Sequence, residues 1–319
     1  MVTDTMRLLS RWIFSAFALS LLAQEDAVFR SDTRLVVLHA TVLDKSGKLL
    51  TDLPRTAFTV LENNVPQQIT TFKREDVPVS LGLVIDNSGS MRDKRARVAA
   101  AALAFVKASN PSDEVFIVNF SDDAYLDVPL SNDIKRLEEG LSRIDTRGGT
   151  AMRDAALMSM GYLKEKAKRD KKVLLLITDG DDTSSVPSNT IEKVITQAQQ
   201  SEVLIYTIGL LADEDRSAAK RATRALRGLA QATGGLAYFP TDIAQVNEIA
   251  NRVAQEIRNQ YVIAYTPTIA KLDGTYRRIQ VKVKAGGTPT VRNRSGYYAT
   301  PDEQKPKSAP SLLYQTKHE

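Results

Sequence analysis

Between Pro78 and about Gln260 the chain alternates short apolar runs with segments of helical periodicity, and this alternation restricts the fold more than any other feature. Strands that alternate with helices become parallel neighbours, because a crossover helix returns the chain to the same end of the sheet. We therefore expect an α/β domain over residues 79–260. It should hold a doubly wound, mostly parallel, Rossmann-like sheet of six strands with helices on both faces.

The expected strands are short and mostly apolar, as a sheet covered on both faces requires. They read VSLGLVID, EVFIVNF, AYLDVPL, KVLLLITD, VLIYTIGLL and LAYFP. Helical periodicity predicts helices over residues 92–109, 133–144, 151–169, 188–202, 216–232 and 242–259. The three residues Ser-Asp-Asp between EVFIVNF and AYLDVPL are too few for a crossover helix. That pair should form an antiparallel hairpin at one edge of the sheet.

Oxygen-bearing side chains follow the strand VSLGLVID at alternate positions: Asp86, Ser88 and Ser90. Two other junctions supply similar groups, since the loop RGGT ends at Thr150 before a helix and the strand KVLLLIT runs into Asp179. Carboxylate and hydroxyl oxygens suit a hard divalent cation. Because parallel strands share one carboxyl edge, we expect these five residues to meet there.

Each of these residues also has a purely structural interpretation. Residues 90–93 fit a helix capping box, Thr150 can cap the helix that follows it, and Asp179 can begin a turn. The five ligand types nevertheless occur together, in order, at three strand ends. The sequence therefore favours a metal site.

The D-x-S-x-S pattern, the threonine after Gly-Gly and the aspartate of Thr-Asp-Gly together resemble the metal-ion-dependent adhesion site of von Willebrand factor type A domains. The resemblance covers about residues 79–260. It implies a divalent cation, with Mg²⁺ preferred over Mn²⁺ or Ca²⁺. Ser88 and Ser90 would bind the ion directly, and Asp86, Thr150 and Asp179 would bind it directly or through water.

Two carboxylates neutralise such an ion but fill few of its roughly six positions, so one position can take an acidic side chain of a partner protein. Asp181 and Asp182 follow closely and are candidate rim residues. They would make the rim of the site more acidic. An acidic rim would weaken the capture of an acidic ligand.

β structure is expected on both sides of the α/β domain. Residues 31–78 contain the runs TRLVVLHATVLD, AFTVLEN and QQITTF, and the last two flank Asn63 and Asn64. Residues 261–300 read as a three-stranded meander made of QYVIAYTP, an alternating run over 278–284 and TVRNRSGYYA.

Each flanking segment is near the size at which a lone hydrophobic core fails. We therefore expect both to join in one small antiparallel β-sandwich with the α/β domain inserted, and two independent β flaps are the alternative. The flanks also resemble bacterial VWFA-related domain proteins. That resemblance rests on the F-x-V-x-E pattern of Phe58, Val60 and Glu62 and on a closing strand like RNRSGYYA.

The N-terminus has the order of a secretory signal: Arg7 and Arg11, the apolar run WIFSAFALSLLA, and the polar QEDA. We expect residues 1–24 to be a signal peptide and the protein to be exported to the periplasm, the cell surface or the medium. An uncleaved anchor is the alternative, and no other transmembrane span is expected. Residues 301–319 are polar and should be disordered.

Composition excludes several functions. The chain has no cysteine, so disulfides, zinc thiolate sites and thiol catalysis are excluded. A formal charge of +5 is too small to argue for nucleic acid as a partner. The two histidines, His39 and His318, lie outside the α/β region, and the sequence has no Walker-type phosphate loop.

We therefore expect an exported, non-enzymatic module that captures a protein ligand at a divalent-cation site, through an acidic side chain of that ligand. One alternative is a structural or assembly scaffold that binds its partners independently of metal. Another is a metal-assisted hydrolase, for which the sequence offers no positioned general base.

Overall fold

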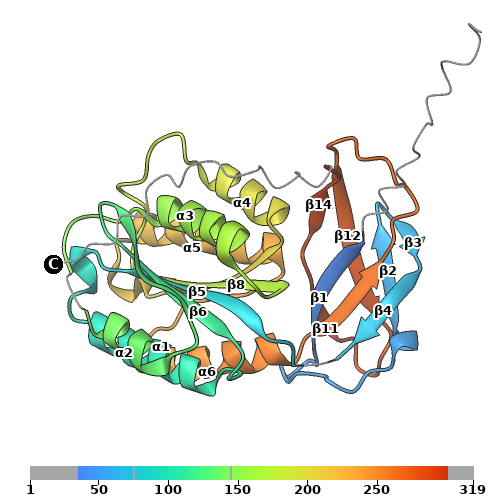
Figure 1. The fold of residues 1–319 in the computed structure, drawn as a ribbon, viewed down its shortest axis with the longest axis horizontal. Helices are drawn as coiled ribbons and strands as arrows, with labels where there is room; N and C mark the ends of the chain where they lie inside the picture. The colour runs from blue at the N-terminus through green and yellow to red at the C-terminus, as the bar shows by residue number, and fades with distance from the viewer. Residues whose placement is uncertain (1–34, 75, 144–145, 301–319) are drawn as a thin grey trace, which may run out of the picture. The chain divides into compact units, whose positions relative to one another are not determined.

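Strands and helices of the middle of the chain form a layered α/β unit (Figure 1). The computed structural model describes residues 35–74, 76–143 and 146–300, all of which belong to one compact unit. The predicted signal peptide, residues 31–34 of the predicted β segment and the predicted disordered tail over 301–319 lie outside the described residues.

The central sheet has six strands in the order β10-β9-β8-β5-β6-β7. These are β5 (Val79–Asp86), β6 (Glu114–Phe120), β7 (Ala124–Ser131), β8 (Lys171–Thr178), β9 (Val203–Gly209) and β10 (Ala237–Tyr238). All neighbours are parallel except β6 and β7, so the sheet is mixed. The predicted antiparallel hairpin at the edge is confirmed.

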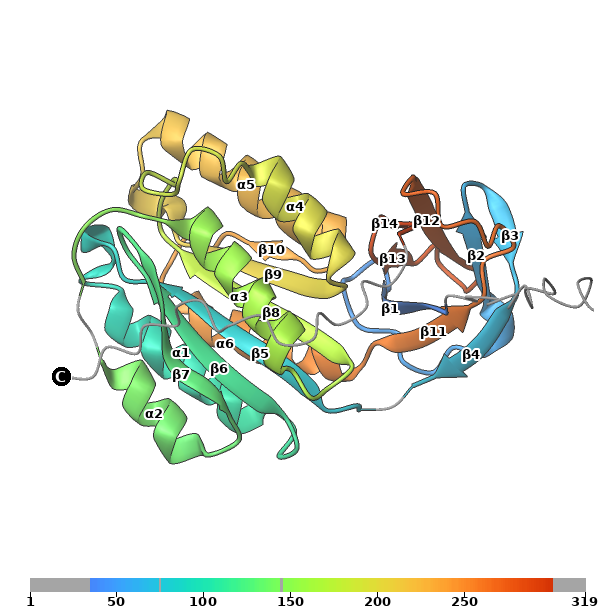
Figure 2. The same ribbon diagram turned by 45° about the horizontal axis from the view of Figure 1, so that its top comes forward.

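Helices cover both faces of this sheet (Figures 1 and 2). One face carries α1 (Arg95–Ala108), α2 (Ile134–Ser142) and α6 (Gln245–Arg258). The other carries α3 (Met152–Lys166), α4 (Ile191–Gln200) and α5 (Arg216–Thr233). Short 3₁₀ turns occur at η1 (Arg55–Ala57), η2 (Gly89–Met91) and η3 (Leu211–Asp213).

The unbroken apolar run of β8 follows from burial on two sides. Val173, Leu175 and Ile177 join the buried cluster beneath α1, α2 and α6. Leu174 and Leu176 point to the opposite face and join the cluster beneath α3, α4 and α5. Each such side chain contributes roughly 1.5–3 kcal/mol on full burial. This packing fixes the position of the strand end that carries the predicted site.

The flanking segments form two further four-stranded sheets, ordered β13-β1-β11-β4 and β14-β12-β2-β3. Their strands are β1 (Val36–Leu43), β2 (Phe58–Glu62), β3 (Val65–Gln67), β4 (Ile69–Lys73), β11 (Tyr261–Tyr265), β12 (Tyr276–Val283), β13 (Thr290–Arg292) and β14 (Gly296–Tyr298). Strands from the two flanks pair directly, β1 with β11 and β2 with β12. Their buried side chains form one hydrophobic cluster.

The predicted meander over residues 261–300 is wrong. β11 pairs with β1 and β4 in one sheet, whereas β12 pairs with β2 and β14 in the other. A meander needs a tight turn, but residues 266–275 form a connection long enough to change sheets. The run TVRNRSGYYA likewise divides into β13 and β14, which lie in different sheets.

Asn63 and Asn64, which two of the expected strands flank, form the turn between β2 and β3. Both residues have positive φ, +48° and +68°, as a two-residue type I′ hairpin turn requires. Asparagine tolerates this conformation better than most residues. The run that follows continues beyond Gln67 into β4, which lies in the opposite sheet.

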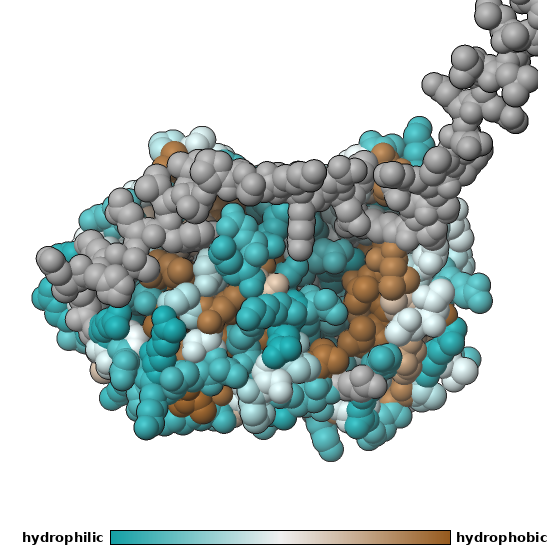
Figure 3. Space-filling model, viewed as in Figure 1, coloured by the Kyte–Doolittle hydropathy of each residue, from teal (hydrophilic) through white to brown (hydrophobic). Residues whose placement is uncertain are grey.

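The surface is mixed in character. On the face shown in Figure 3, hydrophilic side chains dominate and separate the hydrophobic ones into patches. Among the described residues, no helix is both long and apolar enough to cross a bilayer.

Candidate metal centre

Asp86 ends β5, and its carboxylate is fully buried at the start of the loop that follows. Its Oδ1 accepts a hydrogen bond from the Ser88 amide at 2.8 Å, and its Oδ2 accepts one from the Thr178 hydroxyl of β8 at 2.5 Å. Burial raises the pKa of Asp86 to about 6, although these hydrogen bonds oppose the rise. A carboxyl group with such a pKa at a strand end is typical of a functional site.

A row of side-chain oxygens continues from this loop to β8. Ser88 Oγ lies 3.1 Å from Ser90 Oγ, and the Ser90 hydroxyl donates to Asp179 Oδ1 at 2.8 Å. Neighbouring ligand oxygens around an octahedral Mg²⁺ lie about 3.0 Å apart when the metal–oxygen bonds are about 2.1 Å long. The hydroxyls of Ser88 and Ser90 and the carboxylate of Asp179 therefore have a spacing that fits a hard divalent cation.

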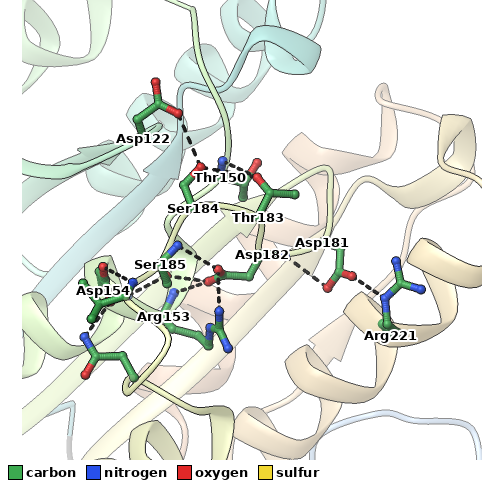
Figure 4. A network of polar contacts seen from close by, with 12 residues as sticks. Asp122, Thr150, Arg153, Asp154, Asp181, Asp182, Thr183, Ser184, Ser185 and Arg221 are labelled. Carbon is green, nitrogen blue, oxygen red and sulfur yellow. Dashed lines mark hydrogen bonds and ion pairs between the residues drawn. The ribbon is translucent and has the colours of Figure 1, made fainter.

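Thr150 lies in the neighbouring loop and is held there by its backbone (Figure 4). Its carbonyl accepts hydrogen bonds from the amides of Thr183 and Ser184 at 2.9 and 3.1 Å, and its own amide donates to Thr183 Oγ1 at 3.0 Å. The amide of Gly89 donates to the Gly148 carbonyl at 3.1 Å. These bonds place the loop of Thr150 beside the loop of the two serines.

Two of the purely structural interpretations are wrong. Helix α1 begins at Arg95, and Ser90 lies in η2 instead of capping that helix. The N-cap position of α3 is Ala151, not Thr150. Neither hydroxyl is therefore needed to cap a helix.

Residues 81–181 match the family model described as von Willebrand factor type A domain. The chain contains a von Willebrand factor type A domain. The matched span starts in β5 and ends in the loop after β8, so it includes all five predicted metal ligands.

Known proteins are similar in sequence to this chain over part of their length. Calcium-activated chloride channel regulator 1 of Equus caballus is 29% identical over 173 residues, which cover 52% of this chain and 17% of that protein. Integrin alpha-11 of Mus musculus is 35% identical over 104 residues, which cover 31% of this chain and 8% of that protein. The chain thus spans less than a fifth of the length of either relative.

A solved structure of a von Willebrand factor type A protein from Catenulispora acidiphila resembles this chain with a TM-score of 0.51. The two share 17% sequence identity, and the match covers 86% of this chain and 76% of that one. At this identity, the likeness shows the α/β fold.

The predicted rim carboxylates of the A domain are both paired with arginines (Figure 4). Asp181 Oδ2 accepts a hydrogen bond from Arg221 Nε at 2.5 Å. Asp182 binds Arg153 through both the backbone amide, at 2.7 Å, and the guanidinium, at 3.0 Å. These ion pairs offset the acidity that the sequence predicted for the rim.

Lys94 is a cation that the sequence reasoning missed. Its ammonium nitrogen lies 2.9 Å from Asp179 Oδ2 and 3.1 Å from Asp213 Oδ2. Burial lowers the pKa of Lys94, but the two carboxylates outweigh this effect and raise it above its ordinary value. A positive charge is thus already fixed beside one of the predicted metal ligands.

Asp122 was also missed, although the strand-end rule could have found it. It follows β6, whose carboxyl end lies on the same edge as that of β5. Its Oδ1 accepts hydrogen bonds from the Gly149 amide at 2.7 Å and the Ser184 hydroxyl at 3.3 Å. Asp213 follows β9 at the same edge, and so the same rule applies to it.

A buried arginine, Arg95, is hydrogen-bonded to the start of the loop that carries Ser88 and Ser90. Arg95 is fully buried, and its Nε donates to Asn87 Oδ1 at 2.6 Å while its Nη2 donates to Asn119 Oδ1 at 3.2 Å. The backbone amide of Asn87 donates to the backbone carbonyl of Phe120 at 2.7 Å. No local pattern predicted this role, because Arg95 reads as an ordinary polar position near a helix start.

Histidine, cysteine and carboxylate side chains do not gather in threes at any point of the described chain. The five candidate ligands do not form such a cluster, because three of them are hydroxyl residues and only two are carboxylates. Binding of a cation by these residues would depend on the conformation of the three loops as much as on the charge of the carboxylates.

Proposed function

We propose that this chain is an exported, non-enzymatic module that captures an acidic side chain of a partner protein through a divalent cation at the carboxyl edge of the A-domain sheet. The observation that carries the proposal is the row of oxygens from Ser88 through Ser90 to Asp179, spaced at 2.8–3.1 Å beside the buried Asp86. That spacing supports a cation of the size of Mg²⁺.

In this proposal Ser88, Ser90, Asp86, Thr150 and Asp179 hold Mg²⁺, with Mn²⁺ or Ca²⁺ able to replace it. The bound ion supplies one open position that a ligand carboxylate can occupy. The protein contributes the fixed loops. Pairing of Asp181 and Asp182 with arginines reduces the repulsion that an approaching carboxylate would meet.

A binding role is favoured over hydrolysis by the groups around the serines. Ser90 donates to Asp179, and the other oxygen of that carboxylate is engaged by Lys94. Among the residues that the structure describes, the one histidine is His39, which lies on β1 in the flanking sheets. The site therefore offers groups that bind and orient, without a histidine base next to the serines.

The test is a pull-down from envelope and secreted fractions of the source organism, with the chain as bait in Mg²⁺ or in EDTA. We expect capture of a partner in Mg²⁺ that is lost in EDTA and lost with Asp86→Ala. The matched control is Asp93→Ala, because Asp93 is exposed in the same loop. Capture unaffected by EDTA and by Asp86→Ala would support the scaffold alternative, and metal-dependent turnover would support the hydrolase.

We also propose that the two flanking segments fold as one β-sandwich domain interrupted by the A domain. The direct pairing of β1 with β11 and of β2 with β12 supports this. Hydrogen exchange on the full chain can test it. Val60→Ala in β2 should raise exchange in β11 and β12 as well as in β1, whereas an increase confined to residues 35–74 would favour two independent flaps.

A further inference from the structure

A second site candidate lies at the opposite, amino end of the A-domain sheet. A cavity of about 820 Å³ opens between the start of β8 and the flanking strands β1 and β11. Basic side chains outnumber acidic ones in its lining. The basic residues are Lys73, Lys168, Arg169, Lys171, Lys172 and Arg294, and the acidic ones are Asp170 and Glu202.

Two of these cations are more than nine-tenths buried. Arg294 is 8% exposed and Lys171 is 4% exposed. Arg294 Nη1 donates to Glu202 at 2.9 Å, but its Nε and Nη2 are buried and have no hydrogen-bond partner among the described residues. Nδ1 of His39, which also lines the cavity, is in the same condition. An unpaired buried polar group destabilises the folded state, so a ligand that pairs with it is favoured.

The electrostatic environment of the cavity also favours an anion. Burial lowers the pKa of His39 well below its ordinary value, and the charges of Lys171 and Arg294 lower it further. Burial also lowers the pKa of Lys171 to about 7, although the charges of Asp76, Asp113 and Glu256 oppose this shift. Helices α3 and α4 end beside the cavity, so their carbonyl ends offset part of the positive charge. They leave Nε and Nη2 of Arg294 without a hydrogen-bond partner among the described residues.

Most of the other lining residues are apolar. Val37, Val77, Val262 and Ala264 contribute hydrocarbon surface next to the basic groups. A pocket with a few convergent polar groups on an apolar wall is typical of small-molecule sites. An anion with an apolar body would pair the free donors and cover this surface.

We propose that this cavity binds a small organic anion. The phosphate or carboxylate group of the anion pairs with Arg294 and the neighbouring basic side chains, and its apolar part contacts the side chains of Val37, Val77 and Val262. The site lies at the edge opposite the metal centre and does not depend on a bound cation. Binding there would also link the A domain to the flanking strands.

The test is isothermal titration of the full chain, in EDTA, with phenyl phosphate and benzoate, and with benzyl alcohol as the uncharged analogue. We expect saturable binding of at least one anion at one site per chain and none of the alcohol. Arg294→Gln should weaken binding at least tenfold. Lys172→Gln should weaken it severalfold and is the gentler change, because Lys172 is only half-buried.

The matched control is Arg224→Gln, which removes an exposed charge from the basic side of α5. It should leave binding unchanged. Absence of saturable anion binding would overturn the proposal, as would equal weakening by all three variants or equal affinity for benzyl alcohol. Circular dichroism melts of each variant identify any loss of binding that comes from unfolding, in which case Lys172→Gln decides.

Discussion

The ammonium group of Lys94 lies 2.9 Å from Asp179, a carboxylate that the A-domain motif assigns to the metal. The same ammonium lies 3.1 Å from Asp213, whose side chain is largely exposed. Lys94 therefore forms ion pairs with two carboxylates at once. A divalent ion that binds Asp179 must compete with Lys94, which can remain on Asp213.

Lys94→Met should tighten Mn²⁺ binding by about fivefold to tenfold. The reason is that a unit charge near a divalent ion contributes roughly 1–2 kcal/mol of repulsion when solvent screens the pair. Isothermal titration with MnCl₂ measures the effect, and Lys107→Met, at an exposed position of α1, is the control. Unchanged or weaker affinity would refute the competition. If neither the variant nor the wild type binds Mn²⁺, the metal site itself is refuted.

Asp86→Asn should stabilise the metal-free protein at pH 7 while removing metal binding. The folded-state pKa of Asp86 is raised from 3.8 to about 6, so the folded state favours the protonated carboxyl group. Its contribution to stability is full below about pH 4 and is lost as pH rises through about 6. At pH 7 we expect a gain of roughly 1–3 kcal/mol for the variant.

Urea denaturation in EDTA from pH 4 to 8 checks this expectation. The difference between variant and wild type should grow up to about pH 6 and stay level above it. A difference that does not change with pH, or a less stable variant at pH 7, would contradict the assigned cause. Mn²⁺ titration of the same variant should show no binding.

Gly148→Ala should disturb the loop that carries Thr150. Gly148 has φ +72°, in the left-handed region, and an added Cβ would lie 2.2 Å from Asp122 Oδ2. Asp122 would then have to move away from the Gly149 amide, which donates a hydrogen bond to its carboxylate. We expect a loss of about 1–2 kcal/mol in unfolding free energy, together with weaker Mn²⁺ binding.

Gly161→Ala is the matched control, because Gly161 lies inside α3 and an added Cβ there meets nothing within 4 Å. Alanine favours a helix over glycine by about 1 kcal/mol, so this variant should be equally or more stable. Equal effects of the two substitutions in thermal melts would contradict the role of the Gly148 turn.

Glu62→Gln should weaken the flanking sheets. The buried Glu62 Oε2 accepts hydrogen bonds from the hydroxyls of Tyr265 at 2.7 Å and Tyr297 at 3.1 Å, which joins the N-terminal flank to the C-terminal flank. Loss of the charged acceptor should reduce the unfolding free energy by about 1–2 kcal/mol. Glu138→Gln on the exposed side of α2 should have no effect in the same urea titration.

Local sequence patterns were sufficient to predict the α/β class, the hairpin at the edge of the sheet and the approximate bounds of the helices. They were sufficient because hydrophobic periodicity is local: β8 is apolar at successive positions since both of its faces are covered. The strand-end rule also placed Asp86 and Asp179 on one edge, as the parallel pairing of β5 and β8 requires.

The pairing of the charged side chains and the order of the strands in the flanking sheets depend on long-range packing, which local patterns do not record. Lys94 reaches Asp179 across 85 positions of the chain, Arg221 reaches Asp181 across 40, and β11 crosses to a sheet that its sequence neighbour β12 does not share. Such partners depend on where whole strands and helices pack. A local pattern records that a side chain is polar or apolar, but the group that it meets is set by contacts between segments far apart in the sequence.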